Sequence, residues 1–446
     1  MKLNSDLMLN LHVRKRKQFA LGMRRLEHLP YFSSSIRKLT EEGYTVALFI
    51  DSKYVKKITD TQIEASFLSA GISVSSVHRM ESLEHPYLKN KVSVYSYLGN
   101  PAYDKDYFTR HMQRARFNPI DRLIVHALSL IPKRKFFIDK LLIKCRRKFS
   151  KNFTYNPEIH GIIKQCDFLI VTPGNMIDSV EDDLFLYAEQ CAINSFWMVL
   201  SWDNLNSKGT PIKLPTKALV WNRLHAQLAA DQHGIEAKNV QVIGSSYHEL
   251  YASNGSISKQ IDLKDVFGIP AEKNVVVYLG SSANIHPNES IHLSELLRDG
   301  SWLERHFLII RPHPAHTMIW SDWNLPGTYV WPKNQNLLQR DIAETSTLFD
   351  QTYLAVGINT SSLWDALALD CPVACIQVPG TIFSDNTSHL NFAKEFGLLT
   401  FRNFMEIEQN FEKVKQSLQA LKPAMLPNFG QTGNKFLQAI NETQGR

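Results

Sequence analysis

The feature that most constrains this chain of 446 residues is a repeated alternation of continuous apolar runs with helical patterns. Continuous apolar runs are typical of strands that helices cover on both faces. The alternation occurs twice, and a polar stretch at 254–274 separates the two series. We therefore expect two parallel sheets with right-handed helical crossovers. The predicted strands lie within 44–51, 166–174, 195–204, 217–222 and 239–245, and then within 275–282, 307–314, 328–332, 352–362, 371–380 and 397–401.

The length of the chain also favours two domains, because a single core stops growing beyond roughly 250–300 residues. We predict an α/β protein with two Rossmann-like domains facing a cleft. The predicted boundaries are 1–250 for the N-terminal domain, 251–425 for the C-terminal domain and 426–446 for a C-terminal helix. Residues 100–165 show no strand pattern, and we expect them to form a helical, basic insertion in the N-terminal domain.

The composition is that of a folded, intracellular protein, with 44% hydrophobic and 21% charged residues. No apolar run approaches the roughly 18 residues that a membrane-spanning helix needs. At the N-terminus the charges follow a short apolar patch, which is the reverse of the order in a secretory leader. The five cysteines form no C-x-x-C pair, and free thiols in a reducing cytoplasm are the simplest interpretation. We expect a cytoplasmic protein.

A strongly basic segment at 133–151, "KRKFFIDKLLIKCRRKFSK", contains one acid, Asp139, and several interleaved apolar residues. Three interpretations are open. The segment is a solvated helix with an ordinary core face, or it contacts an anionic membrane surface, since basic amphipathic helices favour anionic headgroups. Nucleic acid is the third, and no recognisable nucleic-acid-binding motif accompanies the charge, so we expect no nucleic-acid partner.

The residues that follow the strands of the second half are the candidate ligand-binding residues, because ligands bind open α/β sheets outside the carboxyl ends of strands. One strand ends in a small-residue turn at 280–282, another in "RPHP" at 311–314, and a third in "NTSS" at 359–362 before a predicted helix. Small hydroxyl residues at a helix start either cap the helix or bind phosphate with its exposed N–H groups. The candidate nucleotide-binding residues are Gly280, Ser281, Ser282, Arg311, His313, Asn359, Thr360, Ser361, Ser362 and Asp365.

Within this set, Arg311 and His313 are expected to donate hydrogen bonds to the same phosphate, and Pro312 and Pro314 restrict the backbone around the imidazole. Asp365, one turn into the predicted helix, is either an acceptor for a ribose hydroxyl or a first-turn carboxylate that complements the helix dipole.

The "HP" pair and the later Ser/Thr-Ser pair resemble the two nucleotide-binding motifs of bacterial sialyltransferases and capsule Kdo-transferases, which have the GT-B fold and use CMP-sugars. Over roughly 275–395 the pattern "RPHP … GINTSS … PV … H" also resembles surface-carbohydrate biosynthesis proteins, and related architecture occurs in CDP-glycerol glycerophosphotransferases. In the first half, "SWDNLNSKG" at 201–209 and "VWN..H" at 220–225 resemble the same surface-carbohydrate group.

By this resemblance, His313 would contact the donor phosphate, and Ser361 and Ser362 would bind the phosphate end of the nucleotide. The CMP-sugar families carry their base in an acidic D/E-D/E-G motif, and the nearest match here is Glu41-Glu42-Gly43. That triplet precedes a strand and suits a helix end and turn equally well, so the role is not carried over to it.

Asp203 is the better candidate for the base, because it follows an apolar run and should project from a strand end towards the cleft. It is predicted to be catalytic together with His313. The other interpretation is a turn formed by Asp203 and Asn204, with Lys208 as a surface ion partner. Trp202, Asn204 and Lys208 are the candidate acceptor-binding residues, although Trp202 is also suited to a core position.

A second acidic group follows the strand within 166–174. It is either near the site or the exposed first turn of a helix, and it consists of Asp178, Glu181, Asp182 and Asp183.

The sequence contains no G-x-G-x-x-G, no Walker loop, no H-E-x-x-H and no histidine cluster with metal-ligand spacing. We therefore expect no cofactor and no metal, with a nucleotide-activated sugar as substrate. The hypothesis is an inverting glycosyltransferase at the inner membrane face that uses a CMP-sugar and a glycan or lipid-linked glycan acceptor. The N-terminal domain would bind the acceptor and the C-terminal domain the nucleotide-sugar. The alternatives are a CDP-glycerol glycerophosphotransferase-like polymer synthase, a hydrolysing sugar-nucleotide 2-epimerase and a non-catalytic nucleotide-binding protein.

Overall fold

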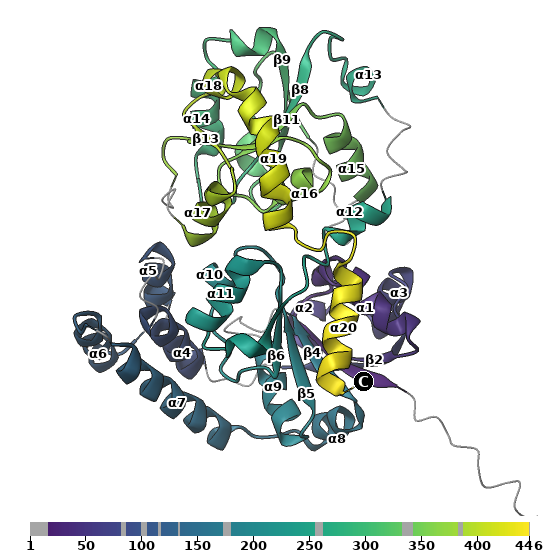
Figure 1. Cartoon of the computed structure of the whole chain (residues 1–446), viewed down its shortest axis with the longest axis vertical. Coiled ribbons are helices and arrows are strands. Elements are labelled where there is room, and N and C mark those ends of the chain that lie inside the picture. Colours follow the sequence, from purple (N-terminus) through teal and green to yellow (C-terminus); the bar gives the residue numbers. More distant parts are fainter. Residues whose placement is uncertain are drawn as a thin grey trace, which may run out of the picture.

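The computed structural model describes residues 17–81, 86–99, 105–114, 117–132, 134–172, 180–254, 262–331, 342–381 and 387–445. Within them are two open sheets in which every pair of neighbouring strands is parallel. Figure 1 shows the two sheets in separate domains, one above the other, with helices on both faces. The predicted α/β architecture of two Rossmann-like domains is therefore confirmed.

The first sheet has the order β3-β2-β1-β4-β5-β6-β7, and the second has the order β10-β9-β8-β11-β12-β13. The strands of the first sheet are β1 (Gln18–Met23), β2 (Thr45–Asp51), β3 (Val74–Met80), β4 (Phe168–Thr172), β5 (Asn194–Met198), β6 (Lys217–Val220) and β7 (Val240–Val242). Those of the second are β8 (Asn274–Leu279), β9 (His306–Arg311), β10 (Thr328–Val330), β11 (Leu354–Gly357), β12 (Val373–Ile376) and β13 (Thr400–Phe401). In both sheets the strand order reverses beside the first strand, and this switch point is where open α/β sheets bind ligands.

The helices before the second sheet are η1 (Leu26–Tyr31), α1 (Ser33–Glu41), α2 (Ser52–Val55), α3 (Asp60–Ser69), α4 (Pro86–Gly99), α5 (Lys105–Arg114), α6 (Pro119–Ser129), α7 (Lys135–Asn152), α8 (Pro157–Gln165), α9 (Val180–Gln190), α10 (Asn204–Ser207), α11 (Arg223–Asp231), η2 (Ala237–Asn239), α12 (Glu249–Asn254) and α13 (Leu263–Phe267). Those that follow are α14 (Glu289–Leu296), η4 (Trp302–Glu304), η5 (Met318–Trp320), α15 (Ile342–Asp350), α16 (Ser362–Ala368), α17 (Ser388–Glu395), α18 (Phe404–Gln409), α19 (Phe411–Met425) and α20 (Thr432–Gln444).

The strands are buried on both faces, which explains their continuous apolar sequences. In β1, Phe19 and Leu21 enter one hydrophobic core while Ala20 enters another on the opposite face. In β8, Val276 and Tyr278 face one core while Val277 faces a second. Because side chains alternate across a strand, each sheet must be covered by helices on both sides.

Two strands of the first sheet were not predicted. Strand β1 is central, yet its sequence "QFALGM" is short and directly follows a run of basic residues. Strand β3, "VSSVHRM", is the edge strand of the sheet, and most of its residues are only partly buried. An edge strand tolerates polar side chains, so its sequence lacks the continuous apolar run that identifies the others.

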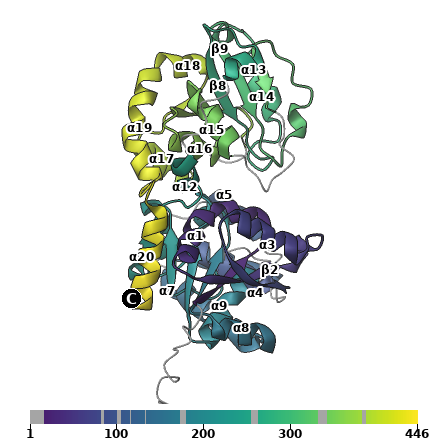
Figure 2. The same ribbon diagram turned by 90° about the vertical axis from the view of Figure 1, so that its right-hand side faces the viewer.

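The C-terminal helix α20 packs on the first domain, although helix α19 before it belongs to the second (Figures 1 and 2). Phe436 and Ile440 of α20 lie in the same core as Phe19, and the side-chain amide of Asn194 donates to the carbonyl of Thr443 at 3.3 Å. The chain therefore crosses between the domains twice, once after β7 and once after α19.

The segment between β3 and β4 is helical throughout its described residues and consists of α4 to α8. Helices α4 and α7 pack together, and Figure 1 shows α5, α6 and the start of α7 projecting from the side of the first domain. Among the described residues, every helix is too short or too polar to cross a lipid bilayer.

Candidate functional site

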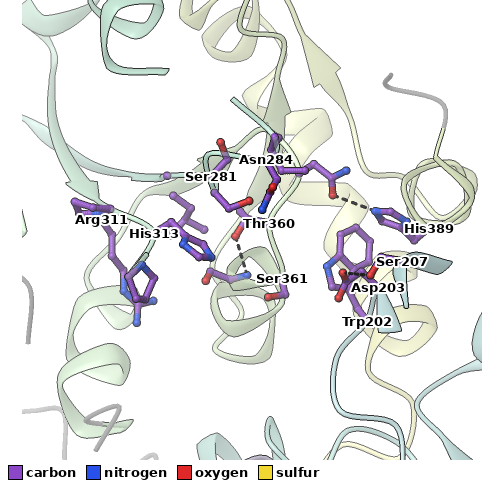
Figure 3. A pocket seen from close by; sticks show the side chains of 18 of the residues that line it. Trp202, Asp203, Ser207, Ser281, Asn284, Arg311, His313, Thr360, Ser361 and His389 are labelled. Carbon is purple, nitrogen blue, oxygen red and sulfur yellow. Dashed lines mark hydrogen bonds between the residues drawn. The ribbon is translucent and has the colours of Figure 1, made fainter. Parts of the chain in front are cut away.

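A cavity of about 340 Å³ opens between the domains, at the carboxyl ends of β8, β9 and β11. The first domain contributes Trp202, Asp203, Ser207 and Lys208 to its lining. In Figure 3, His313 lies between Arg311 and the Thr360–Ser361 loop, and Trp202, Asp203 and His389 form a separate group at one end. The second domain contributes Leu279, Gly280, Ser281, Ser282, Asn284, Ile285, Arg311, Pro312, His313, Pro314, Asn359, Thr360, Ser361, Ser362 and His389. The structure thus brings together the three post-strand segments that the sequence singled out.

The turn after β8 is held by a buried carboxylate. Glu289 accepts hydrogen bonds from the Tyr278 hydroxyl at 2.7 Å, from the Ser281 amide at 2.8 Å and from the Ser281 hydroxyl at 2.9 Å. A side chain at Gly280 would meet the amide nitrogen of His313 at 3.2 Å, so glycine allows this turn to lie directly against the "RPHP" segment. Ser281 is therefore a structural residue of the cavity wall.

His313 is held by its own turn. Its Nδ1 atom accepts a hydrogen bond from the Ala315 amide at 3.1 Å, and its carbonyl accepts from the His316 amide at 2.8 Å. A neutral imidazole that accepts through Nδ1 carries its hydrogen on Nε2, so Nε2 is a donor. The flanking prolines restrict the backbone of this turn. The predicted donor role of His313 is thus compatible with the geometry of the turn.

Arg311 forms an ion pair with Asp365, which is not part of the cavity lining. The Arg311 Nη1 atom lies 3.9 Å from Asp365 Oδ2, and Nη2 donates to the Thr345 hydroxyl at 3.3 Å. Asp365 is almost completely buried, and its Oδ1 also lies 3.3 Å from Nε2 of His248. The carboxylate does not line the cavity, so it is not placed to accept from a ribose hydroxyl bound there. Its place in the structure is instead to position the guanidinium.

The "NTSS" segment forms the floor of the cavity at the start of α16. Ser362 donates its amide to the Thr360 hydroxyl at 3.3 Å, and the Asn359 amide oxygen lies 3.1 Å from His389 Nε2. A side chain at Gly357 would meet the Thr360 methyl group at 2.8 Å, so glycine permits the tight bend after β11. The next two amides of α16 also have acceptors in this segment, since Leu363 donates to the Thr360 carbonyl at 3.3 Å and Trp364 to the Ser361 carbonyl at 3.1 Å.

Asp203 is the carboxylate of the first-domain wall, and both of its oxygens are hydrogen-bonded. The Ser201 and Ser207 hydroxyls donate to Oδ1 and Oδ2, each at 2.6 Å. Burial by itself raises the pKa of Asp203, but Lys208, the two serine hydroxyls and His389 outweigh it and lower the pKa to about 2. A carboxylate with so low a pKa is a weak proton acceptor, which weakens the prediction that Asp203 is the base.

The neighbours of Asp203 also have structural roles. Asn204 is buried outside the lining, and its amide oxygen accepts from the Leu200 and Ser201 amides at 3.0 and 3.3 Å. It shapes the loop and offers no contact for an acceptor. Trp202 lines the cavity but is largely enclosed, because its ring packs edge-on against Trp364 at 4.9 Å and His389 at 4.3 Å between ring centres. Lys208 is half-buried and lies in the lining as predicted.

Several lining residues were not predicted. His389 is buried at the start of α17, and burial lowers its pKa to about 4, although Asp203 acts in the opposite direction. It joins the two domains, since it contacts Asn359 of the second and Trp202 of the first. The sequence offered only a histidine beyond a strand end, and Ser207, Asn284 and Ile285 carried no recognisable signal at all.

The second predicted acidic group is buried beneath the helical insertion. Lys89 lies 2.8 Å from Asp183 and 3.7 Å from Asp182, and all three side chains are almost fully enclosed. Asp182 also accepts from the Ile212 amide at 3.0 Å. Burial raises the pKa of Asp182 to about 7, and Asp183 adds to the effect while Lys89 opposes it. Lys89, Asp182 and Asp183 join α4 to α9, so the acidic group is no exposed first turn. Asp178, which was predicted to belong to the same group, lies outside the described residues.

Within the described residues, no group of three or more histidine, cysteine or acidic side chains is arranged to hold a metal ion.

Comparison with known proteins identifies the fold. No known family model and no curated protein matches the chain. Among solved structures, a putative UDP-N-acetylglucosamine 2-epimerase from Listeria monocytogenes superposes with a TM-score of 0.55 and 10% identity, over 97% of this chain and 98% of that one. The UDP-GlcNAc 2-epimerase from Neisseria meningitidis bound to UDP-GlcNAc gives 0.52 and 12%, over 96% and 100%. A glycosyltransferase from Rickettsia africae gives 0.51 and 11%, over 96% and 98%. The chain has the two-domain GT-B fold.

Proposed function

We propose that the chain is a glycosyltransferase that moves a sugar from a nucleotide-activated donor to a surface-glycan acceptor. The observation that supports this most is the convergence of three strand-end segments, around 280, 313 and 361, on one cavity between the domains. Two of these segments supply groups that suit a phosphate: a guanidinium and an imidazole donor from 311–313, and small hydroxyl side chains from 359–362. The first domain closes the cavity from the other side, where an acceptor would enter.

In this proposal the donor phosphate lies on the second domain, between Arg311, His313 and the Thr360–Ser362 segment. The acceptor hydroxyl attacks the anomeric carbon from the side of the first domain. The new bond to the acceptor oxygen forms as the bond to the phosphate oxygen breaks, the hydroxyl proton passes to water, and the configuration inverts. The negative charge that develops on the departing nucleotide is met by the guanidinium, the imidazole Nε2–H and the hydroxyls of Thr360 and Ser361.

Asp203 and Lys208 are the charged groups on the acceptor side of the cavity. A carboxylate has about four acceptor positions, so Asp203 can still accept a hydrogen bond from an acceptor hydroxyl beyond those of Ser201 and Ser207. That contact would orient the hydroxyl. The low pKa of Asp203 makes it better suited to orientation than to removal of the proton.

Two observations favour different nucleotides in the donor. The "HP" and Ser-Ser motifs resemble those of CMP-sugar enzymes, which favours a cytidine donor. Several structurally similar proteins are UDP-GlcNAc 2-epimerases, which favours a uridine donor. We retain a CMP-sugar as the first substrate to test, because the motifs are at the residues that line the cavity.

A hydrolysing sugar-nucleotide 2-epimerase is the second candidate, and the structural similarity to 2-epimerases favours it. Epimerisation at C2 requires a base that removes a carbon-bound proton, which works best with a pKa near the operating pH. Asp203, with a pKa of about 2, and His389, with a pKa of about 4, do not meet that requirement. Those two groups are therefore poor candidates for the carbon base that an epimerase needs.

The experiment is a screen followed by product analysis. A nucleotide that binds only the folded protein stabilises it by about 2.7 kcal/mol at 100 times its Kd, so CMP, CDP, UDP and GDP can be ranked by thermal shift. Radiolabelled sugars of the best nucleotide are then incubated with extracted surface glycan. A labelled glycoside supports the proposal. A phosphodiester would indicate a glycerophosphotransferase, a free sugar an epimerase, and binding without turnover a nucleotide-binding protein. Equal turnover by the parent and a His313→Ala variant would exclude His313 from the mechanism.

A further inference from the structure

We propose that α6 and the first half of α7 form a membrane-docking surface that inserts apolar side chains among anionic lipid headgroups. The inference deepens the proposed function, since it would bring the cavity to a lipid-linked acceptor. It rests on the outer faces of two helices in the insertion. Figure 1 shows these helices at the far edge of the first domain, away from α20.

Helix α6 is apolar on both of its faces, which is unusual for a helix at the surface. Its inner face buries Val125 and Leu128 against the domain. Its outer face carries a second apolar stripe at the three- and four-residue spacing of one helix side, continuing into the loop before α7. Leu123 is 67% exposed, and the stripe consists of Ile120, Leu123, Ile124, Leu130 and Ile131.

The stripe continues onto α7. Phe136 and Phe137, in the first turn, are 62% and 51% exposed and pack edge-on against each other. Phe136, Lys140, Ile143 and Arg147 recur at three- and four-residue spacing, so they share the outer face of α7, while the inner face buries Ile138, Leu142 and Phe149. Exposed apolar side chains therefore recur along the sequence from Ile120 to Ile143. Exposed apolar side chains gathered in this way indicate an interaction site.

The charged residues around this surface indicate the kind of partner that it binds. Asp121 is buried and paired with Lys91 at 2.6 Å, which leaves Asp139 as the exposed acid among the described residues of 119–151. The exposed cations of the same segment are Arg122, Lys135, Lys140, Lys144, Arg147, Lys148 and Lys151. Apolar side chains among exposed cations suit the interface of an anionic bilayer, where each cation also attracts headgroups.

A second copy of the chain fits this surface poorly. A two-fold dimer would place the same patch on both sides of the interface and bring the cations of one copy against those of the other.

Arg146 and Arg134 are not part of the docking surface: Arg146 is partly buried, and Arg134 donates to the Leu98 carbonyl at 2.7 Å. The helix predicted from sequence alone, 133–151, therefore covers only part of the surface, since α6 supplies most of the apolar stripe.

The experiment measures co-flotation of the full-length protein with vesicles of phosphatidylcholine alone or mixed with phosphatidylglycerol. The parent should bind the anionic vesicles much more tightly than the neutral ones. A Leu123→Ser/Phe136→Ser variant should lose about tenfold or more of that affinity, because two inserting side chains are removed. A Lys140→Gln/Lys144→Gln/Arg147→Gln variant should lose about a hundredfold, because three cations near the headgroups are removed.

Leu68→Ser is the matched control, because Leu68 is 73% exposed on α3 of the same domain, outside the docking surface. It should bind vesicles as the parent does. Equal binding by the parent and the apolar variant, or no preference for anionic vesicles, would overturn the inference. A parent that dimerises, and ceases to do so with Leu123→Ser/Phe136→Ser, would assign the surface to a second copy instead. The nucleotide-induced thermal shift is measured on the same variants without vesicles, so failure of the proposed function is seen separately.

Discussion

A pair of substitutions at His313 tests the cavity most directly, because the two ring nitrogens have different roles. Nδ1 accepts from the Ala315 amide at 3.1 Å and holds the turn, so the hydrogen of the neutral ring is on Nε2, the nitrogen that we assign to the ligand. His313→Asn keeps an acceptor close to the position of Nδ1 but has no atom that reaches as far as Nε2. His313→Gln places an amide nitrogen near the position of Nε2 but loses the acceptor that holds the turn.

The expected effects follow from the hydrogen bonds that each variant loses. A hydrogen bond to a charged partner contributes about 1.5–3 kcal/mol, so His313→Asn should weaken nucleotide binding by roughly 10- to 150-fold. His313→Gln should retain binding within about tenfold, and should lower the free energy of unfolding by about 0.5–1.5 kcal/mol, because the neutral bond to Ala315 is lost. Titration calorimetry with the nucleotide that gives the largest thermal shift measures the first, and urea denaturation the second.

His292→Asn serves as the control, because His292 is a partly exposed histidine of α14 that does not line the cavity. It should bind nucleotide as the parent does. If His313→Asn binds within about threefold of the parent, less than a single hydrogen bond is worth, the imidazole does not contact the phosphate. If the two His313 variants bind the nucleotide equally weakly, the loss of affinity comes from the shape of the turn, and the assignment of Nε2 as the donor is wrong.

Three further predictions concern the buried carboxylates. Glu289→Gln should lower the free energy of unfolding by about 1.5–3 kcal/mol. The reason is that an amide NH₂ replaces an oxygen that accepts from Ser281 or Tyr278. An unchanged midpoint of urea denaturation would contradict this. Asp203→Asn should lower turnover but leave the acid limb of the pH–rate profile in place, since the pKa of Asp203 is about 2; a moved limb would make Asp203 the base. Burial raises the pKa of Asp182 from 3.8 to about 7, so the folded chain retains a proton that the unfolded chain has released. That contribution is complete below about pH 4 and lost as the pH rises to about 7, so urea denaturation should show the parent losing stability relative to Asp182→Asn across this window; parallel curves would refute the assignment.

The success of the sequence in locating the cavity has a simple geometric cause. Carboxyl ends of parallel strands meet at one edge of a sheet, so residues that follow β8, β9 and β11 must lie near one another once those strands are neighbours. Gly280, His313 and Ser361 lie at such positions, and they line one cavity. The rule uses only strand type and strand ends, both of which are local properties of the sequence.

Local sequence information did not identify the short and the polar strand, and it did not predict the direction in which side chains point. Asp365 was expected at a ribose, but it faces Arg311 and His248. Asp203 is predicted to be a base, and two serine hydroxyls and a nearby lysine help to lower its pKa to about 2, which makes it a weak one. Each of these outcomes depends on partners that lie at other places in the chain.

The sequence by itself determined the two parallel sheets, because strands buried on both faces require continuous apolar runs, and it determined which loops meet at their carboxyl edges. Only the tertiary structure decided that α20 returns to the first domain, that His389 contacts Trp202 across the cleft, and that α6 turns a second apolar stripe to solvent. Periodicity records which residues of one element share a face. Which element covers that face, or leaves it open, is set by packing between segments far apart in the chain.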